Sequence, residues 1–265
     1  MYPIELHPEY VKLKEELEDL IFEYESLNNQ ICPNLKEEYI FHFGLLEYNI
    51  HSKEVEIDKI KFKLKLIQKA INNEEKINIS LINKKVEEEF EKYTQRLNES
   101  IEDVFNTLKI RENGKLLSEE DTKELKTKYK KLIKRLHPDL NKNQTDFEKS
   151  LFIRVTDAFK MGDLEELNIL YFMAFDSEDN KEFFSSEEEL KNLIFEFHSK
   201  IDHLKTNFPY NKRELLVNED KTKKYKEDLK FLLKDREDRL KYYNDKLKSK
   251  LKELGFNLDD YDLVS

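Results

Sequence analysis

Apolar residues recur along most of this sequence at the three- and four-residue spacing of a helix. In the first 31 residues they form one heptad stripe: Tyr10, Leu13, Leu17, Leu20, Tyr24, Leu27 and Ile31. Residues three and four apart share one side of an α-helix, so this spacing predicts a helix that Pro8 opens and Pro33 ends. A second helix is expected over 35–50 and a third over about 52–71, followed by a polar turn at 72–75.

The next apolar pattern has a longer period. Ile79, Phe90 and Ile101 lie eleven residues apart, and the same period returns in residues 229–254, where Arg236 takes one apolar position. Eleven-residue periods favour nearly straight helices that pack side by side. Two long helices are therefore expected in these stretches.

Short connections between these helices predict antiparallel hairpins that resemble coiled coils. Residues 207–218, for example, would join a helix around 190–204 to the last long helix. The expected organisation is N-terminal hairpins over 1–112, a three-helix module over 113–175, a C-terminal hairpin over 176–258 and an acidic tail over 259–265. The predicted fold class is all-α.

Composition supports this fold class and exposes a segregation of charge. Only 4 glycines and 5 prolines occur in 265 residues, and 39% of the residues are charged, which argues against a sandwich or barrel. The net charge is −10, yet residues 122–149 hold nine Lys or Arg against four acids, or +5. The remainder therefore carries −15, so a basic segment lies within an acidic chain. Such segregation suggests an acidic docking partner.

The central segment contains the local signals of short helices. Ser118 and Asp121 predict a cap for a helix that runs to Leu136. Gly162 is expected to close a later helix, and Asp163 to cap one more. The apolar positions of the first helix form one face, with Lys130 and Lys134 opposite it and Lys126 and Lys131 on its flanks, so the outer side is basic.

Specific residues in this segment resemble a known family. Tyr129-Lys130-Lys131-Leu132 lies eight residues ahead of His137-Pro138-Asp139, Asn141 follows in the loop, and Phe152, Val155 and Ala158-Phe159 follow in the next helix. Together these features resemble a J-domain, the module by which DnaJ-type co-chaperones engage DnaK-type heat-shock chaperones. The end of the long helix through Ile101, Phe105 and Leu108 is expected to take the place of the family's first helix.

The resemblance implies roles for individual residues. Asp139 would act on the chaperone ATPase and promote hydrolysis, while His137 and Pro138 would hold the loop in shape. Tyr129 would belong to the same chaperone-binding region, although its place on the apolar face favours core packing whether or not the resemblance holds. The lysines at positions 126, 130, 131 and 134 would steer the module to an acidic patch on the chaperone. Alternatively, Pro138 merely ends a helix and the lysines form an ordinary solvated face.

The rest of the chain has none of the accessory parts of larger DnaJ proteins. It contains no Gly/Phe-rich linker, no Cys-x-x-Cys repeats and no strand-rich part, so it resembles the class that shares only the J-domain. The helical arms would then select a client or partner whose identity the sequence does not reveal. A pairing of two chains through these arms also remains open.

No catalytic or metal-binding pattern emerges. The single Cys32 has no histidine nearby, no glycine-rich phosphate loop occurs, and His42 and His51 fall on opposite sides of one helix. We therefore expect no enzymatic activity, no metal and no cofactor. One cysteine and the absence of a long apolar run favour a cytoplasmic protein that does not enter a membrane.

Two other functions remain open. The chain could be a helical scaffold or assembly protein in which the J-like segment is a structural remnant and no longer stimulates a chaperone. Alternatively, the basic helix could bind a nucleic-acid backbone, although the −15 elsewhere in the chain opposes this.

Overall fold

The structure is a computed structural model, and it describes residues 8–113, 117–175 and 186–256. Every element that it describes is helical, so the predicted all-α fold is confirmed. The expected acidic tail over 259–265 lies outside the described residues. Chain contacts divide the molecule into two compact units, and each unit is assembled from two separate stretches of sequence.

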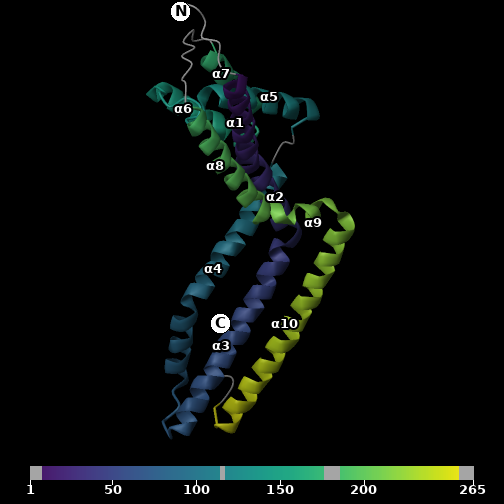
Figure 1. Cartoon of the computed structure of the whole chain (residues 1–265). Coiled ribbons are helices and arrows are strands. Elements are labelled where there is room, and N and C mark those ends of the chain that lie inside the picture. Colours follow the sequence, from purple (N-terminus) through teal and green to yellow (C-terminus); the bar gives the residue numbers. More distant parts are fainter. Residues whose placement is uncertain (1–7, 114–116, 176–185, 257–265) are drawn as a thin grey trace, which may run out of the picture. The chain divides into compact units, whose positions relative to one another are not determined.

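Unit 1 comprises residues 1–37 and 114–214. Its main elements are α1 (Pro8–Ser26), the π-helical turn η1 (Leu27–Ile31), α5 (Glu119–Leu136), α6 (Asp146–Met161), α7 (Leu164–Phe175) and α8 (Glu187–Thr206). We refer to α5, α6 and α7 as the central module. The long helix α1 packs against α8, and both contribute to a single hydrophobic core shared with the module (Figure 1).

Unit 2 comprises residues 38–113 and 215–265. Its main elements are the π-helical turn η2 (Ile40–Gly44), α3 (Leu45–Asn72), α4 (Ile79–Asn113) and α10 (Glu219–Glu253). Helix α3 lies between α4 and α10 and packs against both (Figure 1). Two smaller hydrophobic clusters, one around Ile67 and Leu247 and one around Phe43 and Leu229, lie at different levels along these helices.

These units group the helices differently from the consecutive parts expected from the sequence. The helix α8 belongs to unit 1 and α10 to unit 2, so the two do not form the expected hairpin over 176–258 within one unit. The short elements η3 (Tyr210–Lys212) and α9 (Arg213–Val217) lie between them. The apolar stripe of α8 packs against α1, and that of α10 against α3.

Pro33 does not end the first helix, contrary to the prediction. Residues from Pro8 to Asn72 are helical without interruption, through α2 (Cys32–Tyr39) and the two π-helical turns. Pro33 directly follows the π-helical turn η1, so the N–H that proline lacks falls where the backbone hydrogen bonds change from five-residue to four-residue spacing. The wider turn just before it closes through the Cys32 N–H, which donates to the Leu27 carbonyl, five residues back.

The short-range signals of the central module are confirmed. The hydroxyl of Ser118 accepts from the Asp121 N–H and caps α5. Gly162 ends α6 in the left-handed conformation at φ 66°, and the Asp163 carboxylate accepts from the Glu166 N–H at 2.9 Å at the start of α7. These caps fix the lengths of the helices on both sides of the loop that carries the candidate site.

Across the described residues, no helix combines the length and the apolar character needed to span a membrane. The same residues contain no group of three or more His, Cys, Asp or Glu side chains arranged to hold a metal ion.

Candidate partner-binding site

The loop between α5 and α6 has a defined geometry. His137 takes an extended conformation (φ −70°, ψ 133°), as expected for a residue before proline, and its N–H still donates to the Ile133 carbonyl at 2.9 Å. The carbonyl of His137 accepts in turn from the N–H groups of Leu140 (3.0 Å) and Asn141 (2.9 Å). These bonds close a tight turn over Pro138, so the tripeptide is held by its own backbone.

Asp139 is presented at the surface of this turn. Its N–H donates to Nδ1 of His137 at 3.1 Å, while its carboxylate keeps 40% of its side-chain surface exposed. Since Nδ1 accepts this bond, the neutral imidazole carries its proton on Nε2. The carboxylate is therefore held in position and remains accessible to a partner.

The imidazole of His137 is buried and holds the loop from below. The rings of Phe152 on α6 and Phe197 on α8 meet it edge-on, with centroid distances of 5.4 and 6.0 Å. Its Nε2 lies 3.6 Å from an oxygen of Glu25. This placement agrees with the role in loop shape that the resemblance implies for His137.

Glu25 is the centre of a buried polar cluster that the sequence did not reveal. Its carboxylate accepts from the Asn29 side-chain amide and, at 3.3 Å, from the hydroxyl of Tyr129. Burial and the nearby Glu25 charge raise the pKa of Tyr129, so its hydroxyl stays protonated and acts as a donor. The cluster connects α1 and η1 to α5 and lies next to the imidazole of His137.

Tyr129 itself is fully buried, contrary to its assignment to a binding face. Its ring stacks on Phe159 with centroids 3.7 Å apart and planes parallel within 1°. The tyrosine therefore supports α5 from within the core and does not reach a partner. Its burial follows from its position on the apolar face of α5, opposite the lysines.

The four lysines divide between the two edges of α5. On one edge, Lys130 forms an ion pair with Asp19 of α1 at 2.8 Å, and Lys134 pairs with Glu18 at 2.6 Å. On the other edge, the ammonium of Lys131 lies 5.8 Å from the ring centre of Tyr171 of α7. The fourth, at position 126, is exposed. The structure thus does not gather them into one open patch.

The helix beside the module is α1, which sequence reasoning missed. Residues 101–108 belong to α4, which falls in unit 2, whereas Leu17 and Ile21 of α1 are fully buried in the core that α1 shares with the module. The acidic edge of α1 was present in the sequence as Glu18 and Asp19. The positions of these two acids show that they share one side of a helix, but they do not show which lysines that side contacts.

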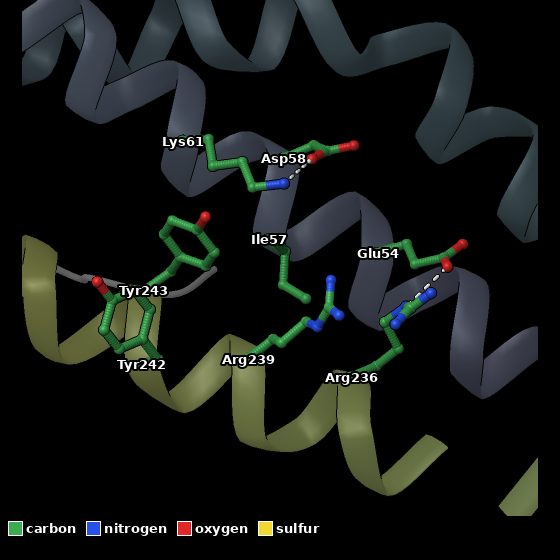
Figure 2. Close-up of a pocket in the computed structure, with 8 residues that line it drawn as sticks. All are labelled: Glu54, Ile57, Asp58, Lys61, Arg236, Arg239, Tyr242 and Tyr243. Atoms are coloured by element: carbon green, nitrogen blue, oxygen red, sulfur yellow. Dashed lines mark hydrogen bonds and ion pairs between the residues drawn. The ribbon is translucent and has the colours of Figure 1, made fainter. Parts of the chain in front are cut away.

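A surface pocket in unit 2 lies between α3 and α10 (Figure 2). Eight residues line it: Glu54, Ile57, Asp58, Lys61, Arg236, Arg239, Tyr242 and Tyr243. Its three cations are paired with carboxylates, Lys61 with Asp58 (3.0 Å), Arg236 with Glu54 (2.8 Å) and Arg239 with Asp235 (3.0 Å). The charges in the pocket are therefore balanced within the protein, and the loop at Asp139 remains the better candidate site.

No protein-family model matches this chain, and the comparisons with curated proteins and with solved structures also gave no match.

Proposed function

We propose that the chain is a J-domain-type co-chaperone that recruits a DnaK-type chaperone and stimulates its ATPase. The observation that carries this proposal is the Asp139 carboxylate, exposed on a turn whose shape is fixed by His137 and by the capped ends of α5 and α6. A rigid, accessible carboxylate of this kind can insert into a polar network of a partner at little entropic cost.

The outer side of α5, the helix that leads into the Asp139 loop, favours a partner with an acidic surface. Lys123 and Lys126 are exposed on α5, and neither has an ion pair with any described residue. Two cations without internal partners would speed the encounter with an acidic surface and orient it. The helical arms would then select the client that is brought to the chaperone, with no metal or cofactor taking part.

Steady-state ATP hydrolysis by the host's DnaK-type chaperone, with and without this protein, tests the proposal. Wild type is expected to raise the rate several-fold, and Asp139→Asn and His137→Gln to abolish the increase. Asp146→Asn is the matched control, because it makes the same chemical change at a fully exposed carboxylate in the first turn of α6. Absence of stimulation by wild type, or equal loss in both Asp→Asn variants, would refute the co-chaperone function.

A second candidate is a helical scaffold in which the module no longer acts on a chaperone. It is favoured by one observation, the pairing of Lys130 and Lys134 with α1, which occupies half of the expected basic face. On this reading, capture of a partner protein would survive Asp139→Asn and His137→Gln unchanged. A pull-down with a defined partner, run in parallel with the ATPase assay, separates the two functions.

A further inference from the structure

Helix α1 presents to α5 the kind of surface that an acidic partner would present. Glu18, Asp19, Phe22 and Glu25 lie on one side of α1, because their spacing of one, three and three residues spans about a third of a turn. Glu18 and Asp19 pair with Lys134 and Lys130, and the Lys130 ammonium also lies 5.3 Å from the ring centre of Phe22. Glu25 is the last of these four residues, and one of its oxygens lies 3.6 Å from Nε2 of His137.

The two ion pairs at this contact differ from the core contact beneath them. Leu17 and Ile21 anchor α1 in the core with no exposed surface, whereas the side chains of Asp19 and Lys130 are 65% and 40% exposed. In the second pair the side chain of Lys134 is 37% exposed and that of Glu18 is 15% exposed. A hydrogen bond from Lys130 holds the pKa of Asp19 below its ordinary value, so the aspartate is charged at neutral pH. Exposed pairs of this kind can open by side-chain rotation while the helix stays in place.

We propose that α1 is an electrostatic brake on the basic face of α5, with Glu18 and Asp19 competing against an acidic partner for Lys134 and Lys130. This inference rests on the proposed function for its partner, a DnaK-type chaperone. Occupied lysines attract an acidic surface less strongly, so the brake lowers the affinity of the module without changing the Asp139 loop.

Neutralising the brake tests this proposal. In Glu18→Gln/Asp19→Asn the core residues of α1 remain, and two lysines lose their internal partners. The matched control is Glu16→Gln/Glu23→Gln, which removes the same charge from residues of α1 that meet His198 and Lys205 of α8 instead of α5. The first variant is expected to lower the chaperone concentration for half-maximal ATPase stimulation about two- to tenfold, with an unchanged maximal rate. Equal shifts in both variants, or no shift in either, would overturn the brake.

A measurement made without the chaperone distinguishes failure of the brake from failure of the proposed co-chaperone function. Amine acetylation of the wild-type protein, followed residue by residue by mass spectrometry, compares Lys130 and Lys134 with Lys123 and Lys126 on the same helix. The two paired lysines are expected to react about two- to fivefold more slowly, and at the reference rate in Glu18→Gln/Asp19→Asn. Equal rates for all four lysines in wild type would overturn the brake even if the chaperone is stimulated. Protection of the pair without any chaperone stimulation would refute only the co-chaperone function and the chaperone as the competing partner.

Discussion

Each unit joins distant helices through charged side chains, but in opposite surroundings. In unit 1 the carboxylate of Glu25 is buried and takes hydrogen bonds from Asn29 and Tyr129. In unit 2 the carboxylate of Glu54 receives Arg236 at 2.8 Å where both side chains remain partly exposed (Figure 2). A buried polar group that loses its partners has no water to replace them, whereas a surface pair does. The same chemistry should therefore be essential to the first unit and nearly dispensable in the second.

The hydrophobic cores of the two units also differ in how concentrated they are. Unit 1 concentrates its buried residues in a single cluster around the α5–α6 pair, and unit 2 distributes fewer of them over two clusters along α3. A single cluster fixes the local geometry of the Asp139 loop, while two distributed clusters mainly hold long helices in register.

The largest effect is expected from the ring that supports the buried polar cluster. Phe159→Ala removes the partner stacked on Tyr129 and leaves a cavity in the fully buried core, so it should lower the free energy of unfolding of unit 1 by about 3–5 kcal/mol. Urea unfolding followed by circular dichroism measures this loss. Phe195→Ala, on the exposed side of α8, is the control and should change stability by less than about 0.5 kcal/mol.

Removing the buried carboxylate comes next. Glu25→Ala leaves the hydroxyl of Tyr129 and the amide of Asn29 without their acceptor, so a loss of about 1–3 kcal/mol is expected in the same unfolding experiment. Glu25→Gln retains an acceptor oxygen and should lose less. A Glu25→Ala protein as stable as wild type would show that the buried cluster contributes nothing, and the contrast between the units would disappear.

A smaller effect is expected at the hydroxyl pair in unit 2. The Tyr225 hydroxyl donates to Glu47 at 3.3 Å beside Tyr39, whose hydroxyl donates to the same carboxylate. Since Glu47 keeps one donor, Tyr225→Phe should cost only about 0.5–1.5 kcal/mol by urea unfolding. Tyr242→Phe, which removes an exposed hydroxyl from the same helix, provides the reference and should be neutral.

The smallest effect, and one that depends on pH, is expected at Arg236. Burial raises the pKa of Glu54, but hydrogen bonds from Arg236 and His51 outweigh it and hold this pKa below its ordinary value. A lowered carboxylate pKa stabilises the fold above the unfolded-state pKa, and the stabilisation is lost as the pH falls through the folded-state pKa. Arg236→Met should therefore cost less than about 1 kcal/mol at pH 7, and this cost should shrink as the pH falls below the ordinary glutamate pKa of about 4.3. A difference from wild type that stays constant down to pH 3 would contradict this assignment.

The sequence predicted the helix caps of this molecule better than it predicted which helices pack together. Ser118, Gly162 and Asp163 act on backbone groups within a few residues, so their caps could be recognised without knowing the fold. An apolar stripe, by contrast, shows which face of a helix is buried but not which helix covers it. For this reason the partner of α1 and the position of α8 were not predictable.

The local contacts of the candidate site were also predictable from the sequence, whereas its contacts with distant residues were not. Asp139 and the turn after α5 follow from proline geometry and the short His137 contacts, all within five residues. The occupation of Lys130 and Lys134 depends on residues more than 100 positions away in the sequence, and the burial of His137 against Phe197 depends on one 60 positions away. Distant contacts of this kind leave no periodic signal around the lysines.

The π-helical turn at Leu27–Ile31 restricts where this chain can tolerate insertions and deletions during evolution. Both Leu27 and Asn29 of this turn are buried in the core of unit 1, and the turn holds one residue more than an α-helical turn would. Deleting Leu27 or Asn28 would move Asn29 about 100° around the helix and away from the Glu25 carboxylate. Deleting a later residue of the turn would remove the wider turn that directly precedes Cys32 and Pro33. Insertions and deletions among natural variants should therefore collect in the exposed connection 73–78 and spare these five positions.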